Sequence, residues 1–229
     1  MIRLDKYLSA SGLGSREFVK KLIQSGRISA EGILKPLPET KVDENTRIFL
    51  DGEEVTYRGL QYVMLNKPAG YLSARTDRTD HVVTELLSGL RDDVSLVGRL
   101  DRDTEGLLLF TNDGALAHRL LSPKNLVPKT YYLKTDRPIP EGARETLSKP
   151  VVFRDFTSAP ADLKVISDCE AELTVTEGKF HEVKRLMHHT GCEVVYLKRI
   201  AFGPLGLGDL VTGAFRHLTE EEIRSLREI

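Results

Sequence analysis

Residues 97–110 read VGRLDRDTEGLLLF, a charged segment between two apolar runs that are typical of β-strands. Gly98 and Gly106 bracket the charged part, which lets the backbone turn tightly at both ends. Catalytic groups concentrate on loops that a rigid sheet holds in place. We therefore predict a functional loop here, in which Arg99 and Arg102 supply guanidinium partners that keep one of the carboxylates ionised.

Other interpretations of this loop stay open from its residues alone. Asp and Gly are favoured in turns for local reasons, so the segment is also typical of a plain charged hairpin loop. A pair of carboxylates can serve glycoside hydrolysis, but a sequence does not give their separation. A calcium site is excluded, because the last position of the calcium loop requires an acid and is Asn112 here, and a strand-like run follows instead of a helix.

Residues 60–229 have the pattern of one larger α+β domain. Strand-like runs are predicted at Tyr62–Leu65, Leu96–Val97, Leu107–Thr111, Thr130–Lys134, Ala171–Thr176 and Val194–Ile200. Helices are predicted at Val83–Leu90, Ala115–Leu121, Ile139–Leu147 and Glu182–His189, and a last one after a capping box formed by Thr219 and Glu222. The excess of strands indicates a large, mainly antiparallel sheet.

Residues 1–58 have the pattern of a separate small module. A first helix is predicted around Leu4, Tyr7 and Leu8, and a second begins after the N-cap Ser15 and ends at Gly26. The apolar stripe of the second helix is expected to comprise Phe18, Val19, Leu22 and Ile23. Short strands are expected at Arg27–Ala30 and Thr46–Leu50, with a hairpin turn at Asp51-Gly52 and the end of the module between Thr56 and Gly59.

Basic side chains are concentrated at the start of the chain, although the whole chain has a formal net charge of −1. Residues 1–27 carry six basic side chains against two acidic ones, a net charge of +4. The basic ones are Arg3, Lys6, Arg16, Lys20, Lys21 and Arg27. Such a face is suited to RNA phosphates, because each neutralised phosphate releases a counterion. A solvated helix surface is the alternative interpretation.

A second basic group lies toward the C-terminus and comprises Lys179, Lys184, Arg185, Lys198 and Arg199. It is suited to the wall of a polyanion-binding cleft, with a solvated basic face as the alternative. The nearby His181, His188, His189 and Cys192 match no familiar zinc spacing, so we expect no metal. No Gly-rich phosphate loop or dinucleotide fingerprint occurs, so we expect no nucleotide cofactor.

The composition is 40% hydrophobic and 29% charged, which is ordinary for a folded globular protein. No apolar stretch approaches the roughly 18 residues of a membrane span. The start of the chain lacks the apolar core of a secretion signal, and two cysteines give no disulfide framework. We therefore expect a cytoplasmic protein without a membrane partner.

Four segments of the larger domain resemble the motifs of a known family, the pseudouridine synthases of the small-subunit ribosomal RNA (RsuA) type. Gly98–Asp101 followed by Asp103–Leu107 resembles the catalytic motif. Asn66–Gly70, Lys129–Tyr131 and Glu177–Arg185 resemble the first, second and third sheet motifs of that family. The resemblance covers nearly the whole chain.

The resemblance also implies roles for site residues. Asp101 stands at the position of the essential aspartate, and Tyr131 at that of the tyrosine that stacks on the target base. Lys184 stands where the family places the cation that pairs with the aspartate, and Arg185 beside it is the alternative partner.

The module around Arg3–Gly32 is similar to the alpha-L RNA-binding domain that a small-subunit ribosomal protein also contains, with Ala30-Glu31-Gly32 in place of the usual Val-Asn-Gly turn. This similarity favours RNA binding over a merely solvated surface. The predicted RNA-binding residues of the whole chain are Arg3, Lys6, Arg16, Lys20, Lys21, Arg27, Lys67, Arg99, Arg102, Lys129, Lys179 and Arg199.

Together the two resemblances imply an enzyme that isomerises a uridine of ribosomal RNA, most closely 16S RNA, to pseudouridine. The implied mechanism depends on an aspartate, flips the target base and uses neither metal nor cofactor. The implied partner is ribosomal RNA or an assembly intermediate of a ribosomal subunit, and we expect a monomer. The alternatives are a large-subunit synthase of the same family and a non-catalytic RNA-binding or ribosome-assembly protein.

Overall fold

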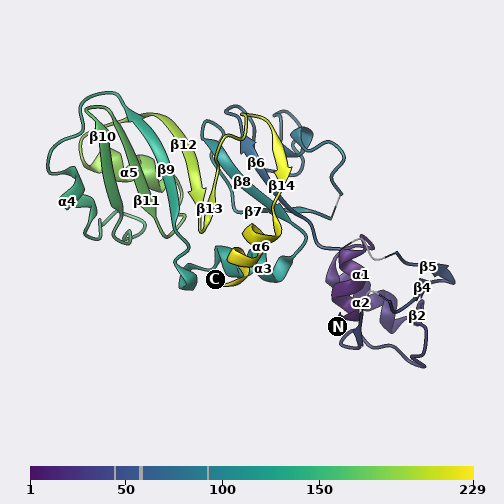
Figure 1. Ribbon diagram of the computed structural model, residues 1–229. Helices are drawn as coiled ribbons and strands as arrows, with labels where there is room; N and C mark the ends of the chain where they lie inside the picture. Colours follow the sequence, from purple (N-terminus) through teal and green to yellow (C-terminus); the bar gives the residue numbers. More distant parts are fainter. Residues whose placement is uncertain (44, 57–58, 92) are drawn as a thin grey trace. The chain divides into compact units, whose positions relative to one another are not determined.

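The computed structural model describes residues 1–43, 45–56, 59–91 and 93–229 (Figure 1). The chain forms two compact units. The first comprises residues 1–61, 89–95 and 111–113, and the second comprises residues 62–88, 96–110 and 114–229. The predicted end of the N-terminal module falls partly on residues 57–58, which lie outside the described residues. In the described part of the chain, no helix is both long enough and apolar enough to cross a membrane.

Two helices and several short strands build the first unit. Helix α1 spans Leu4–Ala10 and helix α2 spans Arg16–Gln24, as predicted. The Ser15 side chain accepts a hydrogen bond of 3.2 Å from the Phe18 amide, and Gly26 follows α2 with a positive φ of 74°, so both predicted helix ends are confirmed. The strands are β1 (Ile2–Arg3), β2 (Ile28–Ala30), β3 (Lys41–Val42), β4 (Ile48–Leu50) and β5 (Glu53–Glu54).

The apolar faces of these elements meet in one core that includes Leu4, Leu8, Val19 and Ile48. The hairpin prediction is confirmed, because β4 and β5 pair antiparallel and both turn residues, Asp51 and Gly52, have positive φ. The predicted place of Phe18 in the apolar stripe is wrong. Its side chain is 51% exposed, since the neighbouring Val19, Leu22 and Ile23 already fill the buried face of α2.

A large mixed sheet forms the second unit, with the strand order β10-β11-β9-β12-β8-β6-β14. Its strands are β6 (Tyr62–Lys67), β7 (Ser95–Val97), β8 (Glu105–Thr111), β9 (Lys129–Thr135), β10 (Asp162–Ser167), β11 (Glu170–Val175), β12 (Val194–Phe202), β13 (Leu205–Gly206) and β14 (Phe215–His217). Six of these correspond to predicted strands, whereas β10 and the short β13 and β14 were not predicted. Most pairings are antiparallel and β12 pairs parallel with β8, so the expected sheet type is confirmed.

The helices of the second unit are α3 (Gly114–Leu121), α4 (Ala143–Leu147), α5 (Glu182–His189) and α6 (Glu220–Arg227), with 3₁₀ turns η1 (Val83–Leu86) and η2 (Pro123–Asn125). The helix predicted over Val83–Leu90 is wrong beyond its first turn, because the chain leaves helical geometry at Leu87 and Gly89 has a positive φ. The helix predicted from Ile139 starts only at Ala143, because the residue before Pro140 disfavours helical dihedrals. The capping box of Thr219 and Glu222 is confirmed.

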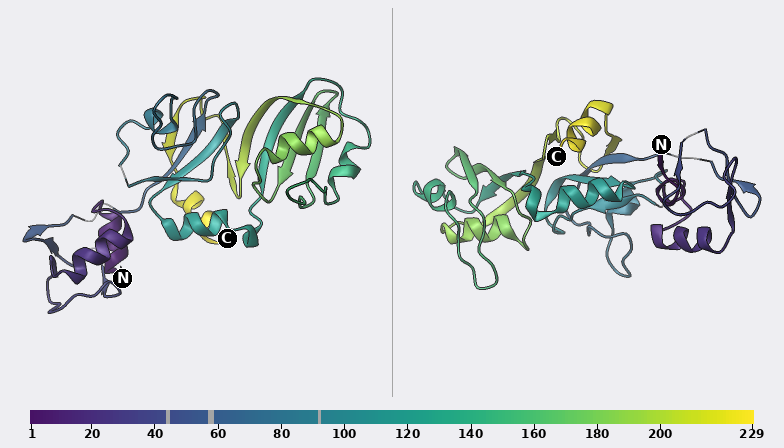
Figure 2. Two further views of the ribbon diagram at one scale, coloured as in Figure 1. Left: turned by 180° about the vertical axis from the view of Figure 1, so that it is seen from behind. Right: turned by 90° about the horizontal axis from the view of Figure 1, so that it is seen from below.

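Helix α5 lies across one face of strands β10, β11, β9 and β12 (Figure 1, Figure 2). Beneath it, Leu133 of β9 and Leu173 of β11 are fully buried. The same face of β9 continues past the start of α5 to Tyr131 and Lys129, because alternate residues of a strand share a face. The sheet therefore offers an uncovered floor where α5 begins.

Gly106 allows β8 and β12 to approach closely at the edge of this floor. It has a φ of 103° and lies opposite Arg199 in the parallel pairing. A Cβ atom at this position would lie 2.2 Å from the Arg199 carbonyl oxygen, a distance that no side chain tolerates. The second glycine of the charged loop is thus required by strand packing.

Candidate active site

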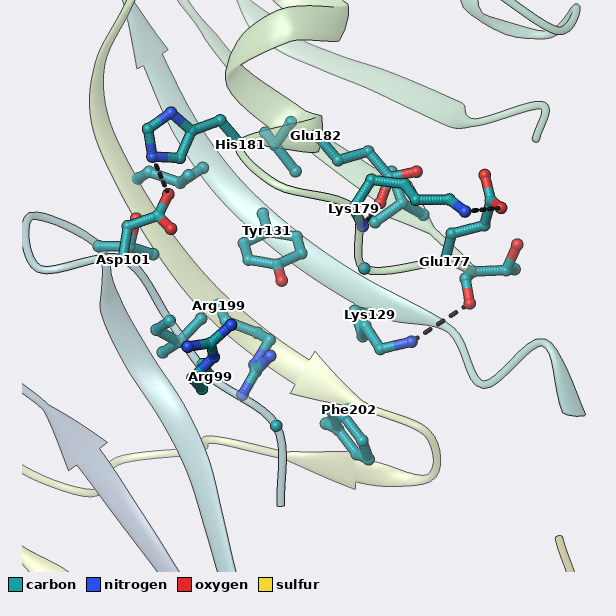
Figure 3. Close-up of a pocket in the computed structure, with 18 of the residues that line it drawn as sticks. Arg99, Asp101, Lys129, Tyr131, Glu177, Lys179, His181, Glu182, Arg199 and Phe202 are labelled. Atoms are coloured by element: carbon teal, nitrogen blue, oxygen red, sulfur yellow. Dashed lines mark hydrogen bonds and ion pairs between the residues drawn. The ribbon is translucent and has the colours of Figure 1, made fainter. Parts of the chain in front are cut away.

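A pocket of about 240 Å³ lies on the uncovered floor of the sheet in the second unit (Figure 3). Its walls come from the loop at residues 98–104, strands β9, β11 and β12, and the start of α5. Charged and aromatic side chains in its lining include Arg99, Asp101, Lys129, Tyr131, Glu177, Lys179, His181, Glu182, Lys184, Arg199 and Phe202. The structure thereby brings together the loop, the second sheet motif and the third sheet motif that the sequence singled out.

Asp101 faces two cationic or potentially cationic groups from α5. Its Oδ2 atom lies 3.7 Å from Nζ of Lys184 and 3.6 Å from Nε2 of His181. The carboxylate keeps 31% of its surface exposed, so a ligand in the pocket has access to it. An accessible carboxylate beside an ammonium group can act as a nucleophile or as a base.

The arginines of the loop do not pair with Asp101, so the prediction that guanidinium groups hold a carboxylate of this loop is wrong for that residue. Arg102 pairs with Asp80 at 3.0 Å and donates to the Gly70 carbonyl oxygen. Arg99 is exposed beside the pocket, and its side chain has no partner among the described residues. The partners of Asp101 come instead from a segment 80 residues away, which local sequence reasoning does not reach.

The two candidate cations of α5 point in different directions, because successive residues of a helix are turned by about 100°. Lys184 donates to both carboxylate oxygens of Asp103, at 2.7 and 2.8 Å, and also reaches Asp101. Arg185 instead pairs with Asp155 and stacks on the Phe153 ring at 4.5 Å. The structure therefore places Lys184 in the site and leaves Arg185 outside it.

His181 is a site residue whose position beside Asp101 was not predicted. It is the N-cap of α5 in the left-handed conformation, with a φ of 53°, and its ring stacks on the exposed Phe180 at 3.8 Å. The sequence signal was a histidine directly before a predicted helix. Among the described residues, no three His, Cys, Asp or Glu side chains come together as a metal site would need.

Tyr131 lies on the floor with only 9% of its surface exposed, and it is directly opposite Arg199 in the pairing of β9 and β12. Directly opposed residues project from the same face of a sheet. Lys129, two residues earlier on β9, donates to the carbonyl oxygens of Val127 and Thr176 at 2.8 and 3.2 Å. The floor is thus an aromatic ring flanked by two buried cationic side chains.

Comparison with known proteins identifies the family. Residues 61–189 match the model of the RNA pseudouridylate synthase family, and residues 2–48 match the S4 domain. The chain belongs to the RNA pseudouridylate synthase family. It is therefore an RNA pseudouridine synthase, an isomerase, and the resemblance found in the sequence is confirmed.

Relatives of this synthase match it over nearly its whole length. An uncharacterized RNA pseudouridine synthase, YtzG, of Bacillus subtilis is 42% identical over 99% of both chains. The ribosomal small subunit pseudouridine synthase A of Escherichia coli is 36% identical over 98% of this chain and 100% of its own. A crystal structure of a pseudouridylate synthase superposes with a TM-score of 0.71 at 31% identity, over 99% of this chain and all of the other. The fold prediction is confirmed by these matches.

Lys67 of the synthase does not face RNA, so its predicted role in RNA binding is wrong. Its side chain is fully buried, and Nζ lies within hydrogen-bond distance, 2.8–3.2 Å, of four backbone carbonyl oxygens, those of Pro68, Asp101, Arg102 and Thr104, which share its three N–H donors. Lys129 and Arg199 are also buried, and face the pocket interior rather than an outer groove. Lys179 is exposed at the rim and pairs with Glu177 at 3.6 Å.

The basic residues of the first unit divide into paired and free groups. Arg3 and Arg16 both pair with the buried carboxylate of Asp5, and Arg27 pairs with Asp51. Lys6 lies 3.4 Å from Asp113 of the same unit. Lys20 and Lys21 are exposed on α2, and no ion pair with another described residue engages them. Part of the predicted +4 face is therefore neutralised within the protein.

Proposed function

We propose that the synthase converts one uridine of small-subunit (16S) ribosomal RNA to pseudouridine. The observation that carries the proposal is the pocket in which Asp101, Lys184 and Tyr131 meet. Similarity along the whole chain to proteins named ribosomal small subunit pseudouridine synthase A, at 35–36% identity, supports the choice of RNA. Large-subunit RNA is the competing substrate within the same family.

The Asp101 carboxylate supplies the reactive group in this proposal. The reaction breaks the bond between C1′ of the ribose and N1 of uracil, turns the base and joins C5 to C1′. An ionised carboxylate can attack C1′ or remove the proton from C2′, and the Lys184 ammonium group lies 3.7 Å from it. The reaction is a redox-neutral rearrangement of one nucleotide, so the pocket needs to hold only that nucleotide.

The target uridine must leave its stack to reach Tyr131 on the pocket floor. Unstacking a base costs a few kcal/mol. Stacking on an aromatic side chain contributes about 1–3 kcal/mol per base, so contact with Tyr131 offsets much of that cost. The exposed Arg99 at the pocket is positioned to contact the backbone of the flipped nucleotide.

Residues 1–58 serve in this proposal as the alpha-L RNA-binding domain, and residues 60–229 as the catalytic domain. The unpaired Lys20 and Lys21 of α2 are the side chains best suited to RNA phosphates, while Arg3, Arg16 and Arg27 are held by carboxylates. The protein acts as a cytoplasmic monomer on ribosomal RNA or on a subunit assembly intermediate.

The test is to incubate the purified protein with unmodified 16S RNA, unmodified 23S RNA and partly assembled small subunits. Pseudouridine is mapped by carbodiimide-dependent stops of reverse transcription. We expect one new stop in 16S RNA, in the free transcript or in the particle, and none with an Asp101→Asn variant. A stop confined to 23S RNA would overturn the choice of the small subunit.

A further inference from the structure

Arg199 is a buried cation that the mechanism above does not use. Its side chain is only 2% exposed and lines the pocket. Its Nε atom donates to the Leu107 carbonyl oxygen at 2.7 Å, which fixes the guanidinium group against β8. Its Nη2 atom is buried and finds no hydrogen-bond partner among the described residues. A buried donor without a hydrogen-bond partner destabilises the folded protein unless a ligand accepts its hydrogen bond.

The register of the sheet places this guanidinium beside the base-stacking residue. Arg199 and Tyr131 are directly opposed, so their Cβ atoms lie about 4.5–5.5 Å apart on one face. Figure 3 shows Arg199 beside Tyr131 on the floor, with Asp101 on the side of Tyr131 away from Lys129. A base stacked on Tyr131 would thus have Arg199 beside it, and Asp101 on the side away from Lys129.

The floor holds two buried cationic side chains, those of Arg199 and Lys129. Neither Arg199 nor Lys129 forms an ion pair with a carboxylate among the described residues, although Glu182 lies in the same pocket. Burial, and then the charge of Arg199, lower the pKa of Lys129 to about 8. Such a floor favours a ligand on which negative charge appears, because charges interact more strongly in a poorly hydrated site.

The proposed reaction generates that charge on the base. When the bond between C1′ and N1 breaks, its electron pair stays with uracil and is delocalised onto O2 and O4. Asp101 satisfies C1′ by bonding to it, or removes the proton from C2′. An electron pair on C5 then forms the new bond to C1′. Asp101 leaves C1′ with its bonding electron pair or, on the other route, returns the proton to C2′. C5 then loses its proton and N1 gains one.

We propose that Arg199 is a second catalytic residue, whose Nη2 atom donates a hydrogen bond to a carbonyl oxygen of the target uracil and stabilises the charge on the detached base. The inference rests on the proposed function of the pocket. In this scheme Asp101 acts on the ribose and Arg199 acts on the base. Preorganised donors of this kind typically contribute about 10²–10³-fold to kcat.

The test compares Arg199→Gln with wild type on RNA that carries either uridine or 5-fluorouridine at the target position. Fluorine withdraws electrons from the ring, so the fluorinated base leaves with less help from a cation. We expect Arg199→Gln to slow single-turnover consumption of uridine by about 10²-fold and that of 5-fluorouridine by only about tenfold, with RNA affinity nearly unchanged. Consumption is followed by chromatography of nucleosides from digested RNA.

The ratio of the two losses separates a catalytic role from a structural one. A partly unfolded variant loses the same factor on both substrates, so equal losses would overturn the inference. Lys164→Gln is the matched control, because it removes the same charge from an exposed position of the edge strand β10. It should change both rates little and equally.

The RNA for this test is whichever transcript the wild-type protein modifies. Modification of 23S RNA alone would contradict the proposed substrate, yet the comparison of uridine with 5-fluorouridine would still decide the role of Arg199. If Arg199→Gln is too unstable, Arg199→Lys is a second variant. It keeps the positive charge but lacks the planar guanidinium N–H donors. It should show a smaller loss with the same preference for the fluorinated base, and a loss without that preference would overturn the inference.

Discussion

The side-chain amine of Lys67 donates a hydrogen bond of 3.1 Å to the backbone carbonyl oxygen of Asp101. The same amine holds Arg102 and Thr104 through their carbonyl oxygens, so one buried cation of β6 fixes the loop that follows β7. A loop must hold a reactive carboxylate in place while RNA binds and leaves. Lys67 thus supports the position of Asp101 without contacting its carboxylate.

Replacing Lys67 by Met should destabilise the synthase and impair catalysis together. The change leaves several buried carbonyl oxygens without a donor, which costs about 3 kcal/mol in free energy of unfolding. Chemical denaturation measures this loss. Lys20→Met on the exposed face of α2 is the control and should cost less than about 0.5 kcal/mol. Equal losses in the two variants would contradict the role of Lys67.

The contribution of Lys67 to stability should rise with pH. Burial lowers the pKa of its amine to about 8, from 10.5 when exposed, although nearby carboxylates offset part of the shift. Between these two pKa values the unfolded chain binds more protons than the folded one. The contribution of Lys67 to the free energy of unfolding therefore increases as pH rises. The loss caused by Lys67→Met should therefore be larger at about pH 9.5 than at about pH 7. Denaturation midpoints at both pH values check this, and a loss that shrinks with pH would refute it.

Asp101→Asn should abolish pseudouridine formation, by about 10⁴-fold or more, because an amide is neither a nucleophile nor a base here. RNA affinity should persist, since the pocket keeps its shape. Asp103→Asn provides the same substitution two residues away, on a carboxylate that engages Lys184 from the exposed side of the loop. That control should retain activity within about tenfold. Product formation at the wild-type rate by Asp101→Asn would remove this residue from the mechanism.

The ends of helix α2 and the hairpin turn could be predicted from the sequence alone. Ser15 and Gly26 mark the ends of α2, and Asp51-Gly52 marks a hairpin, because caps and turns depend on a few adjacent residues. Strand β10 was not predicted, since it alternates poorly and is largely exposed at the edge of the sheet. The short β14 offers only three residues, too few for a pattern.

Several residues of the candidate site could be predicted from the sequence, but their contacts could not. Asp101, Tyr131 and Lys184 were predicted because their motifs resemble those of a family, and all three line the pocket. Lys67 and Arg199 were predicted to bind RNA from their charge, because a basic residue in a sequence looks the same whether it faces an RNA backbone, a buried carbonyl group or the interior of a pocket. Only the tertiary structure, with partners 34 to 92 residues away, separates these cases.

Lys184→Met should lower activity, whereas Arg185→Met should mainly lower stability, although the two residues are adjacent. Lys184→Met removes the ammonium group near Asp101 and should lower kcat on the order of 10²-fold. Arg185→Met removes an ion pair with Asp155 and a stack on Phe153, which should lower the thermal midpoint slightly with little change in kcat. Single-turnover rates and thermal unfolding measure the two effects. A larger loss of kcat in Arg185→Met would reassign the cation of the site.

Replacing Lys20 and Lys21 together by Ala should weaken RNA binding uniformly and reduce its dependence on salt. Each phosphate contact contributes about 0.7–0.9 to the slope of log K against log salt concentration, so the double variant should lose roughly 1.5 from that slope. Arg27→Ala is the control, because the Arg27 guanidinium is already bonded to Asp51 and has less charge to offer RNA. Titrations at several salt concentrations, followed by fluorescence anisotropy, give both slopes. A wild-type slope in the double variant would mean that RNA does not contact this face of α2.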